Sequence, residues 1–143
     1  MSGWLTDNGK TYLLDQDGTP LKDWQKLDGN WYYLDPKDGH MLTGWQKLNG
    51  SWYYLNPQDG QMKTGWLKLD DTWYFLQGSG AMKSGWLYNG GKWYYLSGSG
   101  AMKENVWVES NGLWYYMGPS GAMLTNTVTP DGYIVNKDGV WVR

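Results

Sequence analysis

Short stretches rich in aromatic residues recur in pairs along the chain, and two turn-forming residues separate the members of each pair. Residues 44–48 and 51–55, for example, flank Asn49-Gly50. Asn-Gly is favoured where both central residues of a two-residue hairpin turn take positive φ. The pattern therefore predicts two antiparallel strands joined by a tight turn. The same slot holds Asp28-Gly29, Asp70-Asp71 (the weakest match), Gly90-Gly91 and Asn111-Gly112.

A connector follows each predicted hairpin. Residues 56–60 are Asn-Pro-Gln-Asp-Gly, and proline and glycine favour a loop that reorients the chain over a continuing strand. Alternation along the second strand puts Trp52 and Tyr54 on one face and Tyr53 on the other. Every hairpin should thus carry rings on both faces.

The hairpin and its connector form a repeat of 20 or 21 residues, which three series of residues define. The series are Trp24, Trp45, Trp66, Trp86 and Trp107; Trp31, Trp52, Trp73, Trp93 and Trp114; and Met41, Met62, Met82, Met102 and Met123. A single hairpin is marginally stable in water, so each must pack on its neighbours. We predict an all-β solenoid of stacked β-hairpins.

The repeats are expected to form one domain over residues 1–143. The full pattern covers about 22–123, and the end repeats 1–21 and 124–143 are degenerate. Thr11 stands in the first where later repeats have Trp, and Val128 replaces Trp in the last. Both ends therefore resemble caps.

The composition indicates which residues form the core and argues against several classes of function. The chain has 12 Trp and 12 Tyr against one Phe, so rings are expected to supply most of the buried area. Its net charge is −2 and its 12 basic residues are spread out, which argues against nucleic acid as a partner. No apolar run is long enough to span a membrane, and the N-terminus lacks a signal-peptide pattern. Without cysteine, disulfides and thiol chemistry are excluded.

The recurrence of Trp at two positions in five successive repeats suggests a requirement for rings, since a core accepts other hydrophobic residues of similar volume. Rings at about right angles around a small apolar pocket suit a quaternary ammonium, whose charge lies beneath methyl groups and attracts aromatic faces. Methionine would add an adaptable wall. The alternative interpretation is that all these rings are core.

The segments Gly44-Trp45, Trp52-Tyr53-Tyr54 and residues 60–66 resemble the choline-binding repeats of streptococcal cell-wall hydrolases and phage lysins, such as the C-terminal module of the major pneumococcal autolysin. The likeness covers nearly the whole chain. It implies a left-handed superhelix with choline held between consecutive hairpins. Its partners would be choline or phosphocholine on teichoic or lipoteichoic acid, and a homodimer through terminal hairpins is also implied.

In this family a site combines both Trp of one hairpin, the first Tyr after the second Trp of the next hairpin, and an intervening Met. The resemblance implies four sets: Trp24, Trp31, Met41 and Tyr53; Trp45, Trp52, Met62 and Tyr74; Trp66, Trp73, Met82 and Tyr94; and Trp86, Trp93, Met102 and Tyr115. A fifth set would be Trp107, Trp114, Met123 and Tyr133. At the front, Thr11 and Leu21 replace Trp and Met beside Trp4 and Tyr32, so the first set is incomplete.

Catalytic and metal sites find little support in the sequence. Asp70-Asp71 fills a hairpin turn, and the only His, His40, occupies a loop position that other repeats fill with Gln61 or Ala81. Acidic loops at residues 15–18 and 136–139 lack the remaining ligands of a calcium loop. We expect no cofactor, no metal and no enzymatic activity, in a module secreted to the bacterial cell surface. A glucan-binding module and a structural or dimerising stalk are the alternatives.

Overall fold

The computed structural model describes residues 3–143, which consist of β-strands and loops with no helix in that range. The strands are β1 Gly3–Asp7, β2 Lys10–Leu14, β3 Asp23–Leu27, β4 Asn30–Leu34, β5 Gly44–Leu48, β6 Ser51–Leu55, β7 Gly65–Leu69, β8 Thr72–Leu76, β9 Gly85–Asn89, β10 Lys92–Leu96, β11 Val106–Ser110, β12 Leu113–Met117, β13 Thr127–Val128, β14 Ile134–Val135 and β15 Trp141–Val142. The predicted strands 44–48 and 51–55 are confirmed as β5 and β6.

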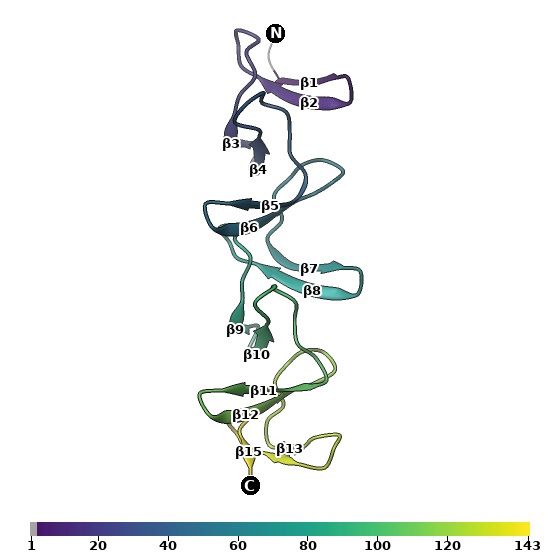
Figure 1. The fold of residues 1–143 in the computed structure, drawn as a ribbon, viewed down its shortest axis with the longest axis vertical. Helices are drawn as coiled ribbons and strands as arrows, with labels where there is room; N and C mark the ends of the chain where they lie inside the picture. Colours follow the sequence, from purple (N-terminus) through teal and green to yellow (C-terminus); the bar gives the residue numbers. More distant parts are fainter. Residues whose placement is uncertain (1–2) are drawn as a thin grey trace. The chain divides into compact units, whose positions relative to one another are not determined.

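Strands β1 to β12 pair as six two-stranded antiparallel hairpins, and β13 to β15 form a three-stranded sheet (Figure 1). Both central turn residues have positive φ, at 51° and 84° in Asn49-Gly50. The predicted turn geometry is therefore confirmed. Asp70 and Asp71 adopt it too, with φ of 49° and 67°, although Asp71 stands where five other hairpins have glycine.

The residue before the first Trp explains part of the Gly-Trp pattern. Gly44 begins β5 with a φ of 75°, a region that side-chain-bearing residues rarely adopt. Asp23 holds the equivalent place before Trp24 with a φ of 65°. The chain thus enters each of these hairpins through a left-handed residue.

Each connector folds back and ties two consecutive hairpins together. The Met62 N–H donates to the Trp31 carbonyl of the preceding hairpin at 2.9 Å, while Lys63 N–H donates to Tyr54 O of its own hairpin at 2.9 Å. Met62 also forms an isolated antiparallel β-bridge with Leu55. The same bond to a preceding Trp or its counterpart is made by Met41, Met82, Met102 and Met123. These repeated bonds stack the hairpins within each unit of the chain.

The most deeply buried side chains are aliphatic, and the expectation that rings supply most of the buried area stays a prediction. Leu34, Leu55, Leu76 and Leu96 each have 0% exposure, as does Met117. They end the second strand of successive hairpins, directly after the aromatic triplet.

Two compact units make up the described chain: residues up to Gly65 with Leu76–Met82, and Trp66–Phe75 with Lys83–Arg143. The first contains β1 to β6, and Figure 1 shows each of these hairpins turned relative to the one before it. The second contains β9 to β15 and most of β7 and β8. That residues 1–143 form a single domain, with a left-handed superhelix, stays a prediction. No helix long and apolar enough to cross a bilayer occurs among residues 3–143.

Candidate ligand-binding site

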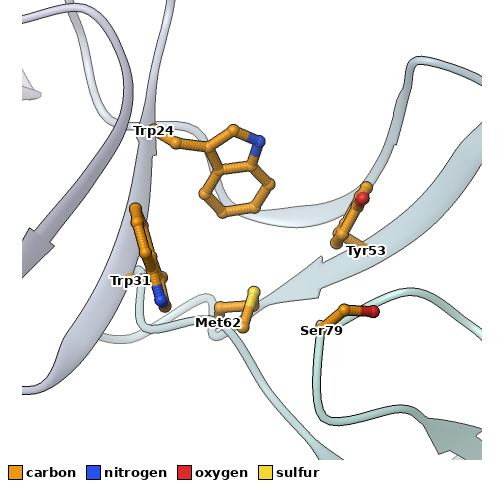
Figure 2. Close-up of a pocket in the computed structure, with 5 residues that line it drawn as sticks. All are labelled: Trp24, Trp31, Tyr53, Met62 and Ser79. Atoms are coloured by element: carbon orange, nitrogen blue, oxygen red, sulfur yellow. The ribbon is translucent and has the colours of Figure 1, made fainter.

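An open cavity of about 240 Å³ in the first unit is lined by Trp24, Trp31, Tyr53, Met62 and Ser79 (Figure 2). The ring centroids of Trp24 and Trp31 are 6.2 Å apart with an interplanar angle of 87°. The Trp24 and Tyr53 centroids lie 5.1 Å apart at 66°. Three rings therefore present differently oriented surfaces to one small space.

Strand register explains why these rings meet. Trp24 of β3 is paired with Tyr33 and Trp31 of β4 with Lys26, so both Trp lie on the same face of their hairpin. Tyr53 of β6 is paired with Gln46, on the opposite face of its hairpin from Trp52. One hairpin therefore supplies two rings and the next hairpin supplies the third.

The methionine wall comes from the connector that follows the second hairpin. The hydrogen bond from Met62 N–H to Trp31 O fixes the connector backbone beside that tryptophan. Gly80, in the connector one repeat further on, lies so close to Met62 that an added Cβ would be 2.3 Å from its sulfur. Its neighbour Ser79 lines the cavity. Three consecutive repeats thus contribute to one pocket.

The second unit repeats this arrangement twice. One cavity, of about 370 Å³, is lined by Trp66, Trp73, Tyr94, Met102 and Ser120. Another, of about 260 Å³, is lined by Trp86, Trp93, Tyr115 and Met123. In both, the two Trp rings are 6.1 Å apart and within 3° of perpendicular. The geometry of the pocket is therefore a property of the repeat.

The ring surfaces are open to solvent. Trp31 is 38% exposed and Trp93 43% exposed, in contrast to the fully buried leucines beside them. None of the side chains that line the described pockets is charged. This combination of exposed perpendicular rings and an uncharged lining attracts a cation through aromatic faces and accommodates methyl groups by apolar contact.

A last pocket lies at the degenerate end. It has a volume of about 200 Å³ and is lined by Trp107, Trp114, Tyr133 and Trp141. The Trp107 centroid is 6.0 Å from that of Tyr133 and 6.3 Å from that of Trp141. Four rings surround this pocket, and an indole stands where the other pockets have methionine.

Comparison of the sequence with protein-family models identifies the family of the chain. A family model described as a choline-binding repeat matches residues 1–43, 42–85 and 64–107, and a second model of that description matches 104–141. The chain belongs to the choline-binding repeat family. Comparison with curated protein sequences gives no match.

Solved structures of choline-binding proteins match over the full chain. Choline binding protein F (CbpF) of Streptococcus pneumoniae, crystallised with a peptidoglycan analogue, is 49% identical with a TM-score of 0.91, covering 100% of this chain and 47% of CbpF. CbpF in complex with ipratropium gives 44% identity and a TM-score of 0.89, with 100% and 49% coverage. The chain thus spans about half the length of this relative.

The modular autolysin LytC of S. pneumoniae shares the fold at lower identity. It is 24% identical with a TM-score of 0.69, over 99% of this chain and 37% of LytC. The predicted fold class and the predicted family are both confirmed by these matches.

The methionine assignments are where sequence and structure disagree. The sequence places Met41, Met62, Met82, Met102 and Met123 each with the Trp pair that precedes it, but the described pockets have the methionine from one repeat further along. Met62 lines the Trp24 pocket, Met102 the Trp66 pocket and Met123 the Trp86 pocket. The connector folds back over the preceding hairpin, so the methionine that follows one Trp pair in the sequence lines the pocket of the Trp pair before it.

The Trp and Tyr groupings agree with the prediction in three sets, and the fifth set gains its Tyr133 as expected. Trp141 replaces Met123 in that last set. The set of Trp45, Trp52 and Tyr74 draws on both units and stays a prediction. Its proposed Met62 belongs to the Trp24 pocket.

The incomplete set at the N-terminal end keeps the contact between the first Trp of one hairpin and the Tyr of the next hairpin. Trp4 and Tyr32 approach with ring centroids 4.9 Å apart, as their counterparts do in the complete choline-binding repeats. Thr11 occupies the place of the second Trp, and its carbonyl accepts the Met41 N–H at 2.7 Å. The N-terminal end therefore keeps the backbone hydrogen bond between connector and preceding hairpin but lacks the second Trp of a complete pocket.

Sequence reasoning missed Ser79, Ser120 and Trp141. Trp141 lies outside both Trp series, yet it is two residues after Gly139, as Met123 is after Gly121. That Gly-x-Met spacing was the available signal for its role. No comparable signal marked the two serines, because their contribution depends on how the third repeat folds against the pocket.

Three indole N–H groups in the second unit donate to side chains of the following repeat that do not line the described pockets. Trp66 Nε1 donates to Asn89 Oδ1 at 3.3 Å, Trp86 Nε1 to Ser110 Oγ at 3.1 Å and Trp107 Nε1 to Asp131 Oδ2 at 2.9 Å. Hydrogen bonds from Thr129 and then Trp107 lower the pKa of Asp131. The last acceptor of the three is therefore an ionised carboxylate at neutral pH.

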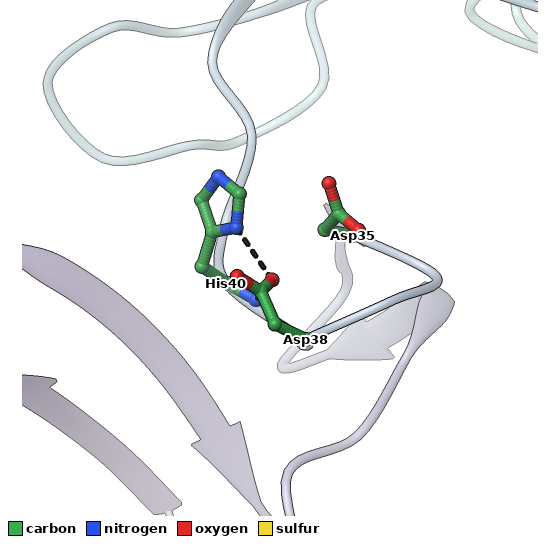
Figure 3. Close-up of side chains that lie close together, drawn as sticks. All are labelled: Asp35, Asp38 and His40. Atoms are coloured by element: carbon green, nitrogen blue, oxygen red, sulfur yellow. Dashed lines mark hydrogen bonds and ion pairs between the residues drawn. The ribbon is translucent and has the colours of Figure 1, made fainter.

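One group of potential metal ligands occurs among residues 3–143: Asp35, Asp38 and His40 (Figure 3). Asp38 Oδ1 bonds both the His40 N–H at 3.0 Å and its ring Nδ1 at 2.6 Å, and Lys10 Nζ is 3.6 Å from Asp38 Oδ2. Asp59 caps the next connector through the Gln61 N–H in the same way. Turn hydrogen bonds thus explain the group.

Proposed function

We propose that this chain is a non-catalytic module that binds choline residues of teichoic or lipoteichoic acid and anchors a protein to the bacterial cell surface. The observation that carries the proposal is the open pocket built from perpendicular ring faces and a methionine. It occurs within each unit, with the same contributions from successive repeats. Membership of the choline-binding repeat family supports the same ligand.

Choline fits the chemistry of such a pocket. Its trimethylammonium group has no N–H donor, so it gains little from a hydrogen-bonding pocket and much from aromatic faces and apolar contact. Trp31 contributes an exposed ring and Met62 a polarisable, flexible wall. A ligand with a full hydration shell, such as an ammonium or a metal ion, would lose more solvation than these walls return.

Single-site affinity should be modest. Cation–π attraction of roughly 0.5–2 kcal/mol per ring, with burial of methyl groups, suggests dissociation constants on the order of millimolar after the entropic cost of binding. Retention on a wall polymer then depends on several pockets binding several choline residues at once. A tandem array is the architecture that such multivalent attachment requires.

The comparison with CbpF supports a quaternary ammonium ligand. CbpF has been crystallised in complex with ipratropium, a compound that carries such a group. We further propose that the protein is secreted to the cell surface and that terminal hairpins mediate a homodimer. Any catalytic domain joined to this module would act on peptidoglycan.

Two other functions make different predictions. A glucan-binding module would use the rings as platforms for sugar faces, and a structural or dimerising stalk would need no small ligand. The perpendicular rings favour a compact cation over a flat sugar ring, and the exposed Trp31 and Trp93 argue against a purely structural role.

Intrinsic tryptophan fluorescence, titrated with choline and separately with glucose oligomers, distinguishes the three functions. We expect a saturable change with choline in the millimolar range, no change with sugar, and a melting temperature that rises with choline concentration. Elution from DEAE resin by choline after a high-salt wash has failed would support ring recognition over net charge. A response to glucose oligomers alone would replace the proposal by the glucan alternative.

A further inference from the structure

The pockets of this chain differ in the side chain paired across the hairpin from the second tryptophan. Lys26 is paired with Trp31, Tyr88 with Trp93 and Glu109 with Trp114. These partners share a face of the hairpin with the tryptophan because they are directly opposite in register. None of the three lines a pocket.

In two pockets a lysine ammonium group lies over the ring of the second tryptophan. Lys26 Nζ is 5.9 Å from the Trp31 centroid, and Lys68 Nζ is 5.8 Å from the Trp73 centroid. Both distances are within the range of a cation–π contact. The ring that would receive a ligand cation in these two pockets is therefore already engaged by a cation of the protein.

The next pocket replaces the lysine by a ring. Tyr88 is 59% exposed, and its centroid is 5.0 Å from that of Trp93 with an interplanar angle of 53°. It brings no formal charge to the tryptophan.

The last pocket has carboxylates at both tryptophans. Glu109 is opposite Trp114, and Asp131 accepts the indole N–H of Trp107 at 2.9 Å. The corresponding acceptors of Trp66 and Trp86 are the neutral Asn89 and Ser110. A carboxylate on the indole N–H and another beside the second ring both make the pocket more attractive to a cation.

We propose that the residue opposite the second tryptophan sets the charge preference of each pocket, with Lys26 and Lys68 disfavouring, Tyr88 tolerating and Glu109 favouring a ligand of net positive charge. The inference rests on the proposed choline function. Choline binding is then strongest at the Trp107 pocket and weakest at the Trp24 and Trp66 pockets.

Coulomb repulsion sets the expected size of the effect. A ligand on the pocket side of Trp73 would lie roughly 10 Å from Lys68 Nζ, because each cation stays within about 6 Å of the ring centroid. At that separation, with water and salt between the charges, one unit charge changes affinity by roughly two- to fourfold. The sign reverses for phosphocholine, whose phosphate carries about −1.5 to −2 and gives a net negative ligand.

Fluorine NMR of the full chain labelled with 5-fluorotryptophan resolves the pockets, with each signal assigned by a Trp→Phe substitution. In a choline titration we expect the Trp31 and Trp73 signals to reach half-saturation at two- to fourfold higher concentration than Trp93, and Trp114 to saturate first. Lys68→Ala should lower the Trp73 midpoint two- to fourfold for choline and raise it for phosphocholine. Glu109→Gln should raise the Trp114 midpoint for choline.

Lys92→Ala is the matched control. Lys92 is an exposed lysine that begins β10 opposite Asn89, so its loss removes the same charge without uncovering a tryptophan across the hairpin. The Trp73 midpoint should not change. Equal choline midpoints at all pockets, or a Lys68→Ala shift of the same sign with both ligands, would overturn the inference. If no signal responds to choline, the proposed function fails instead.

Discussion

Gly80→Ala tests how the connector of one repeat holds the methionine of the previous repeat. A Cβ added at Gly80 would lie 2.3 Å from the sulfur of Met62 and 2.9 Å from its methyl carbon. Favourable non-bonded contact needs about 3.5 Å, so the methionine end must move by roughly 1 Å. The open cavity beside Trp24 and Trp31 is where it can go.

The substitution carries two separable costs. Gly80 has a φ of 90°, so any side chain there strains the backbone by about 1–2 kcal/mol. Displacing Met62 adds roughly 1 kcal/mol, at the low end of overpacking because the side chain is flexible. Gly50→Ala is the matched control, since its φ is 84° and its Cβ would meet nothing within 4 Å.

Urea unfolding followed by tryptophan fluorescence would measure these costs in a double-mutant cycle with Met62→Ala. We expect Gly80→Ala to destabilise by about 1 kcal/mol more than Gly50→Ala, and this excess to vanish when Met62 is alanine. Choline affinity at the Trp24 pocket should also fall in Gly80→Ala, because the displaced methionine fills the cavity. A coupling energy near zero would refute the proposed contact between the two repeats.

Three further predictions concern individual residues. Met62→Ala should weaken choline binding at the Trp24 and Trp31 signals several-fold, whereas Met41→Ala should leave those signals unchanged in fluorine NMR; the reverse result would restore the grouping expected from sequence. Asp71→Gly should stabilise the chain by about 0.5–1 kcal/mol in urea unfolding, because Asp71 has a φ of 67° at a turn position that favours glycine, and no gain would show that the local backbone is unstrained. Hydrogen bonds from His40 lower the pKa of Asp38 from 3.8 to about 2, so its contribution to stability is present above pH 3.8 and is lost as the pH falls toward 2. The melting temperature of Asp38→Asn should therefore decline less than that of the wild type between pH 4.5 and 2, and parallel declines would contradict the assignment.

The hairpins could be predicted because their signals are local. Asn49-Gly50 between two aromatic strands specifies both the turn and the register, and the structure has the expected strand limits. Alternation predicted only that each hairpin carries rings on both faces, and the grouping of Trp24, Trp31 and Tyr53 came from the resemblance to choline-binding repeats. Local geometry repeated at a fixed spacing was enough to predict the hairpins.

Assigning the correct methionine to each pocket requires knowing how the connectors fold against neighbouring hairpins, which the local sequence does not specify. Met41 lies between Trp31 and Tyr53 in the sequence, but the direction in which a connector folds is set by the Met62–Trp31 backbone bond and by the close approach of Gly80 to Met62. The complete burial of the leucines was not predicted, for a different reason. Leu34 and its counterparts are few beside the rings, but the stacking places each of them at the fully covered end of a strand.

Recognition of a charge by ring faces is tested most directly by comparing choline with 3,3-dimethyl-1-butanol, which replaces the nitrogen by carbon and keeps the shape. Tryptophan fluorescence titrations at high salt should give saturation by choline in the millimolar range and binding of the neutral analogue at least about tenfold weaker, since about 1.4 kcal/mol of cation–π attraction is lost. Equal affinities for the two compounds would contradict the account, because the pockets would then recognise only apolar shape.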